Sequence, residues 1–113
     1  MKSKILALSK NEEFKSLLKQ NKITNKYVTI FFGNLENKDS KKLNISFVTK
    51  KKIGNAVKRN RIRRKLKAII IKMLKIKGAI NLNYTYIVFG KTKAYFAKHD
   101  ELFEEMMKGF KKI

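Results

Sequence analysis

Four arginines and one asparagine are the side chains of this 113-residue sequence whose type and spacing best fit a chemical task. Of the 29 basic residues, 25 are Lys and only 4 are Arg. All four lie within six positions, at Arg59, Arg61, Arg63 and Arg64, with Asn60 between the first two. The planar guanidinium forms paired hydrogen bonds to phosphates and base edges, whereas a Lys ammonium acts as a point charge. The cluster therefore predicts binding of a phosphate-rich ligand.

Side chains that could hydrolyse a bond are scarce. A protein nuclease usually needs clustered carboxylates for metal ions, or a His pair for acid–base catalysis. Glu36 and Asp39 lie in a polar stretch typical of a solvated turn, and His99 is the one histidine. Cys is absent, which excludes disulfides and Cys-based zinc sites. We therefore expect neither a catalytic residue nor a metal ligand in this chain, and a surface position at a helix start for His99.

The distribution of charge points to a polyanion. The net charge is +21, and none of the eight acidic residues lies between positions 40 and 99, a stretch with 18 basic residues. A solvated helix face usually mixes charges of both signs, so we interpret this stretch as a binding surface for nucleic acid. No apolar run approaches the roughly 20 residues of a spanning helix, and no signal peptide is visible. We expect a soluble, cytoplasmic domain that does not bind membranes.

Three strands are predicted to support this surface. Aromatic and β-branched residues, or strict alternation, mark residues 27–32, 43–49 and 84–90. The first two are expected to pair as a hairpin with a long polar loop over residues 33–42. Residues 91–98 are interpreted as a basic connection.

Three helices are also predicted. A short one covers about residues 10–20, because Ser9 and Glu12 have capping-box spacing. A long one covers about residues 56–77, with Asn55 as N-cap and Gly78 at C′. Its apolar face is expected to comprise Ile62, Leu66, Ile69, Met73 and Ile76, widened by Ile70 and Leu74. Asp100 is expected to cap the last helix, whose apolar side comprises Leu102, Phe103, Met106, Met107 and Phe110.

These elements give the order α-β-β-α-β-α, which predicts a small α+β sandwich with helices packed on a sheet. The length indicates one RNA-binding domain over residues 1–113. About residues 1–8 and 112–113 are expected to be disordered.

Residues 50–66, which read KKKIGNAVKRNRIRRKL, closely resemble the signature of the bacterial ribonuclease P protein subunit. In that family a basic turn and a Gly lead into a helix that carries Arg-Asn-Arg. The match comprises Lys51, Lys52, Gly54, Ala56, Val57, Arg59, Asn60, Arg61, Arg64 and Leu66. The order of elements and the length also fit, so the resemblance covers roughly residues 8–110.

The resemblance implies a division of labour between an RNA and a protein. A large RNA subunit would hold the active site and most of the magnesium, and would hydrolyse the phosphodiester bond that joins the 5′ leader to tRNA. The protein would be an accessory subunit of this endoribonuclease and a monomer by itself. The resemblance also implies a four-stranded sheet, with one short strand, and a left-handed βαβ crossover through the long helix, against the usual handedness.

The resemblance also implies two binding surfaces. Residues expected to face the catalytic RNA are Lys58, Arg59, Asn60, Arg61, Arg63, Arg64 and Lys65. Residues expected to bind the leader of precursor tRNA are Phe14, Leu18, Phe32, Lys50, Lys51, Lys52 and Lys91. Aromatic rings suit unpaired bases, but Phe14, Leu18 and Phe32 could equally belong to the core. Ile30 also fits the position assigned to Phe32.

Other functions remain open at this point. A ribosomal or other structural RNA-binding protein would share the charge, the size and the lack of catalytic groups. A DNA-binding helix in the major groove would predict a compact helical domain, whereas strands are visible in this sequence. An enzyme that acts alone is disfavoured by the missing carboxylates.

Overall fold

The computed structural model describes residues 5–6, 11–34 and 43–113, without the side chains of residues 5, 6, 11 and 13. Its strands are β1 (Ile5–Leu6), β2 (Asn21–Thr24), β3 (Val28–Gly33), β4 (Leu43–Val48) and β5 (Thr85–Gly90). Its α-helices are α1 (Asn11–Leu18), α2 (Ala56–Leu74), α3 (Thr92–Phe96) and α4 (His99–Lys111), and a single 3-10 turn, η1, spans Lys51–Ile53. The predicted α+β sandwich is confirmed.

The strands form one mixed sheet in the order β1-β4-β5-β3-β2. This sheet has one strand more than the four that the resemblance implied, because the two-residue β1 also pairs with β4. β5 runs parallel to β4 and antiparallel to β3, and β2 is the short antiparallel strand beyond β3. The predicted hairpin between residues 27–32 and 43–49 is therefore wrong, because β5 lies between these two strands. β5 is buried over most of its length, as a central strand must be. The α2 crossover joins the parallel pair, and its handedness stays a prediction.

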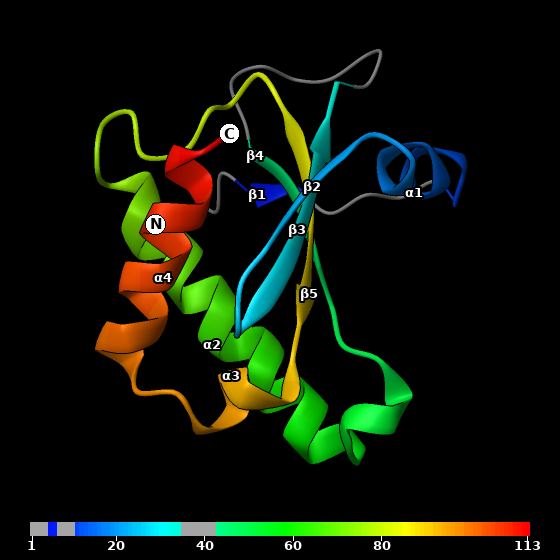
Figure 1. The fold of residues 1–113 in the computed structure, drawn as a ribbon, viewed down its shortest axis with the longest axis vertical. Coiled ribbons are helices and arrows are strands. Elements are labelled where there is room, and N and C mark those ends of the chain that lie inside the picture. Colours follow the sequence, from blue (N-terminus) through cyan, green and yellow to red (C-terminus); the bar gives the residue numbers. More distant parts are fainter. Residues whose placement is uncertain (1–4, 7–10, 35–42) are drawn as a thin grey trace.

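Figure 1 shows the sheet nearly edge-on, with α2 and α4 packed on one face and α1 on the other. The main core lies on the α2 side. There Ile62, Leu66, Ile69 and Met73 are completely buried, as the helical period predicted. From α4, Leu102 and Met106 are completely buried and Phe110 nearly so, against β-strand residues such as Ile30 and Val88.

A glycine permits the close approach of α2 to the sheet. A Cβ atom added to Gly90 in β5 would lie 2.5 Å from Cγ2 of Ile62 and 3.2 Å from Cδ1 of Leu66. Any side chain at this position would push α2 away from β5. Gly90 therefore helps to set the distance between the sheet and the helix that carries the arginines.

Several predicted boundaries need correction. α2 ends at Leu74, so Ile76 is 41% exposed and does not extend the apolar face. Gly78 has a positive φ of 79°, but it lies in the following turn and not at C′. α4 begins at His99 after Lys98, and Asp100 lies in its first turn instead of capping it. The expected connection over residues 91–98 contains α3.

The ends of the predicted domain fall partly within the described residues. The amide nitrogens of Lys112 and Ile113 donate to Gly109 and Phe110 at 3.2 Å, and Ile113 packs against the core. These contacts place both residues at the end of α4, and the disorder expected for residues 1–8 and 112–113 stays a prediction. Ser9, Glu36 and Asp39 lie outside the described residues, and so does most of the loop at 33–42.

Candidate nucleic-acid interface

The arginine cluster lies in the first turns of α2, and an asparagine sets where that helix begins. Oδ1 of Asn55 accepts a hydrogen bond from the Lys58 amide at 2.9 Å, which confirms the predicted N-cap. The buried positions Ile62 and Leu66 hold one side of the helix on the sheet. Asn60, Arg61 and Arg64 are therefore turned outward, and all three are exposed.

A groove of about 800 Å³ runs between α2 and β4. We call it the α2 groove; its lining residues are Ile45, Ser46, Phe47, Asn60, Arg63, Arg64 and Lys67. Among these described residues three are cationic and none is acidic, so the groove attracts a phosphate backbone. Lys67 lies here in addition to the residues that the sequence assigned to RNA.

Arg63, which lines the groove, connects α2 to the end of β4 through a hydrogen bond. Its Nη1 donates to Oγ1 of Thr49 at 2.9 Å, and its Nη2 donates to Oδ1 of Asn60. Thr49 directly follows β4, so the guanidinium ties α2 to the end of that strand. Asn60 orients Arg63, and part of the hydrogen-bonding capacity of both side chains is already used within the protein.

Lys65 has an internal role that departs from its assignment to the RNA surface. Its ammonium donates to the carbonyl oxygens of Ala94, Tyr95 and Ala97 at 2.7–2.9 Å. Burial, and secondarily the nearby Arg61, lowers the pKa of Lys65 below its usual range. With all three donors occupied, this side chain holds α3 against α2 and is not available to a phosphate.

Lys58 and Arg59, the other two cations assigned to the catalytic RNA, are half-buried. Nζ of Lys58 lies 5.0 Å from the ring centroid of Tyr95 and 5.3 Å from that of Phe96. Nε of Arg59 is buried without a hydrogen-bond partner in the described part of the chain. The Arg59 side chain is thus partly packed into the protein at the edge of the helix surface.

The opposite face of the sheet carries a second hollow of about 800 Å³, which we call the sheet cleft. Its lining residues are Leu18, Lys22, Thr29, Phe31, Lys50, Lys52, Ile53, Phe89, Gly90, Lys91 and Thr92. Four lysines thus surround two phenylalanine rings. This combination of cations and aromatic faces suits a single strand with unpaired bases.

Phe31, and not Phe32, is the aromatic residue of β3 that faces this cleft. Its ring lies 5.4 Å from that of Phe89. Phe32 points to the other face, where it packs against the main core with its ring 5.6 Å from that of Tyr84. Phe32, which the sequence assigned to the leader surface, therefore lies on the core side and not in the sheet cleft, because alternate residues of a strand face opposite ways.

The packing of α1 shows where Phe14 and Leu18 lie relative to the core and the sheet cleft. Leu17 is completely buried and packs the helix down, whereas Leu18 is 37% exposed and lines the cleft. Phe14 is half-buried, with its ring 6.4 Å from that of Phe89 in an edge-to-face arrangement. Phe14 thus contributes to both the small core under α1 and the aromatic surface beside the cleft.

Two of the lysines assigned to the leader surface, Lys91 and Lys51, differ from the others in their contacts or position. Nζ of Lys91 donates to Oγ1 of Thr24 at 2.8 Å and to the carbonyl of Asn25 at 2.6 Å, so it also closes the turn between β2 and β3. Lys51 is exposed on η1 but does not line the cleft, unlike its neighbours Lys50 and Lys52.

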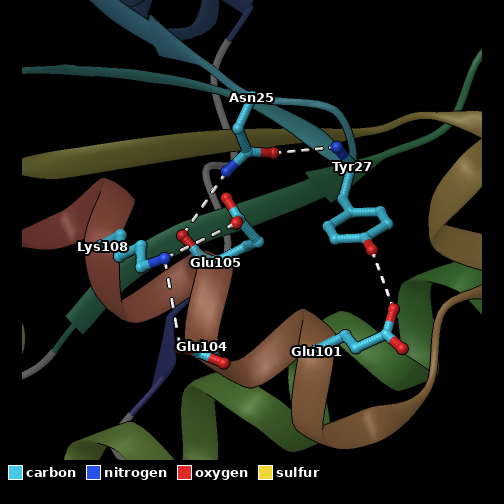
Figure 2. Close-up of polar contacts among 6 residues, drawn as sticks. All are labelled: Asn25, Tyr27, Glu101, Glu104, Glu105 and Lys108. Atoms are coloured by element: carbon cyan, nitrogen blue, oxygen red, sulfur yellow. Dashed lines mark hydrogen bonds and ion pairs between the residues drawn. The ribbon is translucent and has the colours of Figure 1, made fainter.

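Four of the described acidic residues, Asp100, Glu101, Glu104 and Glu105, lie on α4, and Figure 2 shows the polar contacts of the last three. Tyr27 donates from its hydroxyl to Oε2 of Glu101 at 3.1 Å, and Nδ2 of Asn25 donates to the Glu105 carbonyl at 3.5 Å. Lys108 lies 4.0 Å from the carboxylates of Glu104 and Glu105.

No group of three or more His, Asp or Glu residues in the described part of the chain could hold a metal ion. His99 starts α4 and is exposed, as predicted.

Comparisons with known proteins agree with this arrangement. The family model described as ribonuclease P matches residues 3–113. The chain belongs to the ribonuclease P protein family. The ribonuclease P protein component of Carboxydothermus hydrogenoformans is 44% identical over 62 residues, which are 53% of this chain and 52% of that protein. The chain thus aligns with about half the length of this curated relative.

Solved structures of RNase P proteins share the fold. A mutant RNase P protein of Staphylococcus aureus matches with a TM-score of 0.77 and 22% identity, over 93% of this chain and 85% of that one. The RNase P protein of Thermotoga maritima matches with a TM-score of 0.76 and 19% identity, over 96% and 97% of the two chains. At these identities, the likeness establishes the architecture. None of the described helices is long and apolar enough to cross a membrane.

Seven of the eleven residues that line the sheet cleft were not assigned from the sequence, and three of these seven carry a charge or an aromatic ring: Lys22, Phe31 and Phe89. The alternation of side chains along β3 and β5 could have identified the two rings. Once Ile30 and Val88 are assigned to the core, Phe31 and Phe89 must face the other way. Lys22 lies in β2, a strand that the sequence pattern did not reveal.

Proposed function

We propose that the chain is the protein subunit of ribonuclease P, which binds the catalytic RNA and the 5′ leader of precursor tRNA. Maturation of tRNA 5′ ends is the known role of its family. The observation that carries the proposal is the presence of two separate basic surfaces, the α2 groove and the sheet cleft, on opposite sides of one sheet. One protein can therefore hold two RNA segments at once.

The α2 groove would bind the catalytic RNA. Its exposed Arg64 and Lys67, together with Arg61 nearby, offer charge-assisted hydrogen bonds to phosphates. The buried face of α2 holds the helix on the sheet, so the backbone positions from which these cations project are fixed.

The sheet cleft would bind the leader. A leader is single-stranded, so its bases are free to stack on Phe31 and Phe89 while its phosphates contact Lys22, Lys50 and Lys52. Mature tRNA lacks this segment. Contacts in the cleft therefore favour the precursor over the product.

Hydrolysis itself is assigned to the RNA subunit, which would also hold most of the magnesium. The described residues of this chain offer no carboxylate cluster for a metal ion, so the protein contributes binding and orientation. We place this activity in the cytoplasm, where the RNA partners of a bacterial enzyme of this kind are made.

Reconstitution tests the proposal. The protein, the catalytic RNA of the same source and precursor tRNA are combined at a magnesium concentration too low for the RNA alone to act. We expect leader removal in the complete mixture and none with nuclease-treated protein alone. Cleavage by the protein alone, or no stimulation of the RNA, would contradict the proposal.

A further inference from the structure

Helix α3 ends in two adjacent aromatic residues that belong to neither surface described above. The rings of Tyr95 and Phe96 lie 5.0 Å apart and nearly perpendicular, at 86°. Phe96 is 73% exposed, whereas the other aromatic side chains in the described residues are buried or half-buried. We call this pair of rings the aromatic platform.

The platform is held in place. The Lys65 ammonium donates hydrogen bonds to the carbonyl oxygens of Ala94, Tyr95 and Ala97, which lie before, within and after the pair of rings in the sequence. Ala94 is completely buried against the core. Because the backbone on both sides of Phe96 is anchored to α2, the exposed ring has a defined position before any ligand arrives, which lowers the cost of binding.

Cations from the first turns of α2 surround the platform. Nζ of Lys58 lies 5.0 and 5.3 Å from the centroids of Tyr95 and Phe96, and the guanidinium of Arg61 lies 5.9 Å from Tyr95. An apolar partner surface alone would leave these charges uncompensated. An anion next to a flat, apolar group would satisfy both the cations and the ring, and a nucleotide has this combination.

We propose that the aromatic platform binds an unpaired nucleotide of the same RNA that contacts the α2 groove. The base stacks on the ring of Phe96, and the adjacent phosphate lies by Lys58 and Arg61. This inference rests on the proposed function, because it extends the contact between α2 and the catalytic RNA onto α3. It also gives Lys65 a positioning role, through α3, in place of direct RNA contact.

Three variants of Phe96 test the stacking. Phe96→Ala should weaken binding of the catalytic RNA of the same source by about 5- to 150-fold, the range expected for one stacked base. Phe96→Leu keeps apolar bulk without a ring and should lose nearly as much. Phe96→Trp should bind at least as tightly, and because the chain has no other Trp, its fluorescence should be quenched by the RNA. Ile76→Ala, which also truncates an exposed apolar side chain, is the matched control and should bind normally.

The outcomes separate this inference from the proposed function. Thermal unfolding of Phe96→Ala should match that of the wild type, since the ring is exposed. Arg64→Ala, in the α2 groove but not in the platform, reports on the proposed function alone. If Arg64→Ala weakens RNA binding while Phe96→Ala and Phe96→Leu bind normally and the fluorescence of Phe96→Trp is unchanged by RNA, the platform does not bind RNA and this inference is wrong. If the wild-type protein does not bind the catalytic RNA, both proposals fail.

Discussion

The α2 groove and the sheet cleft are both basic hollows of about 800 Å³, but they are built differently. Five buried residues hold α2 on the sheet, and its exposed cations include arginines. In the cleft, all four cations are lysines, the floor is aromatic, and the covering helix α1 is anchored by Leu17. Guanidinium groups suit paired hydrogen bonds to the phosphates of a folded RNA, whereas lysines around aromatic rings suit a single strand of variable sequence.

Salt should produce the largest difference between the two surfaces. If assembly with the catalytic RNA neutralises about six phosphates, log K should fall with log salt with a slope of roughly −4 to −5. Affinity would then drop roughly 250- to 1,000-fold between 50 and 200 mM salt. The added preference for precursor over mature tRNA should fall less steeply, because stacking contributes to it. A slope near zero for assembly would show that the α2 groove is not the interface.

Removal of two arginines should weaken assembly next most strongly. Changing Arg61 and Arg64 to Ala should reduce the affinity for the catalytic RNA by about 1–3 kcal/mol, because charge-assisted contacts to the RNA are lost. The free energy of unfolding should change by no more than about 0.5 kcal/mol, since both side chains are exposed. Changing Lys111 and Lys112 to Ala removes the same charge from the far end of α4 and is the control. Equal losses in both double variants would mean that only net charge matters.

Phe31 and Phe32 sharpen the comparison, since neighbouring rings face opposite sides of the sheet. Phe31→Ala should reduce the holoenzyme's preference for precursor over mature tRNA by about 1–3 kcal/mol, the contribution of a stacked base. Phe32→Ala should leave this preference unchanged and lower the free energy of unfolding, because it truncates a ring packed on the core. Binding to tRNA with and without a leader, together with denaturant unfolding, measures both. The reverse result would place the leader on the α2 side of the sheet.

Lys51 and Lys52 provide the smallest and most specific test. Both are exposed on η1 and carry the same charge, but only Lys52 lines the cleft. Lys52→Ala should reduce the preference for precursor tRNA by about 0.5–1 kcal/mol, and Lys51→Ala by less. The same binding assay decides between them. A larger effect at Lys51 would restore the sequence-based assignment of this residue to the leader surface.

Local patterns in the sequence predicted the parts of the fold that depend on near neighbours. The helical period identified Ile62, Leu66, Ile69 and Met73 as buried, and Asn55 was identified as the N-cap of α2. These features depend on residues within one or two turns. The order of residues from Lys50 to Leu66 also indicated the family, because a signature of this kind lies in one continuous segment of the chain.

Features that depend on distant contacts could not be predicted in this way. The place of β5 between β3 and β4 follows from pairing across more than 35 residues, so the hairpin expected from chain order was wrong. The internal role of Lys65 depends on carbonyls 29–32 residues away. Phe32 was misplaced for a different reason, because an apolar run such as Ile30–Phe32 fits either face until the register of the strand is known.

The central claim is that the two surfaces do separate work, and one crossed measurement tests it most directly. The Arg61→Ala/Arg64→Ala variant and the Phe31→Ala variant are each titrated with the catalytic RNA to measure affinity. Holoenzymes are then assembled at saturating protein, and the preference of each for precursor over mature tRNA is measured. We predict that the arginine variant loses RNA affinity but keeps the wild-type preference once assembled, and that Phe31→Ala shows the opposite pattern. A loss of leader preference in the assembled arginine variant, with weakened assembly for Phe31→Ala, would contradict the account.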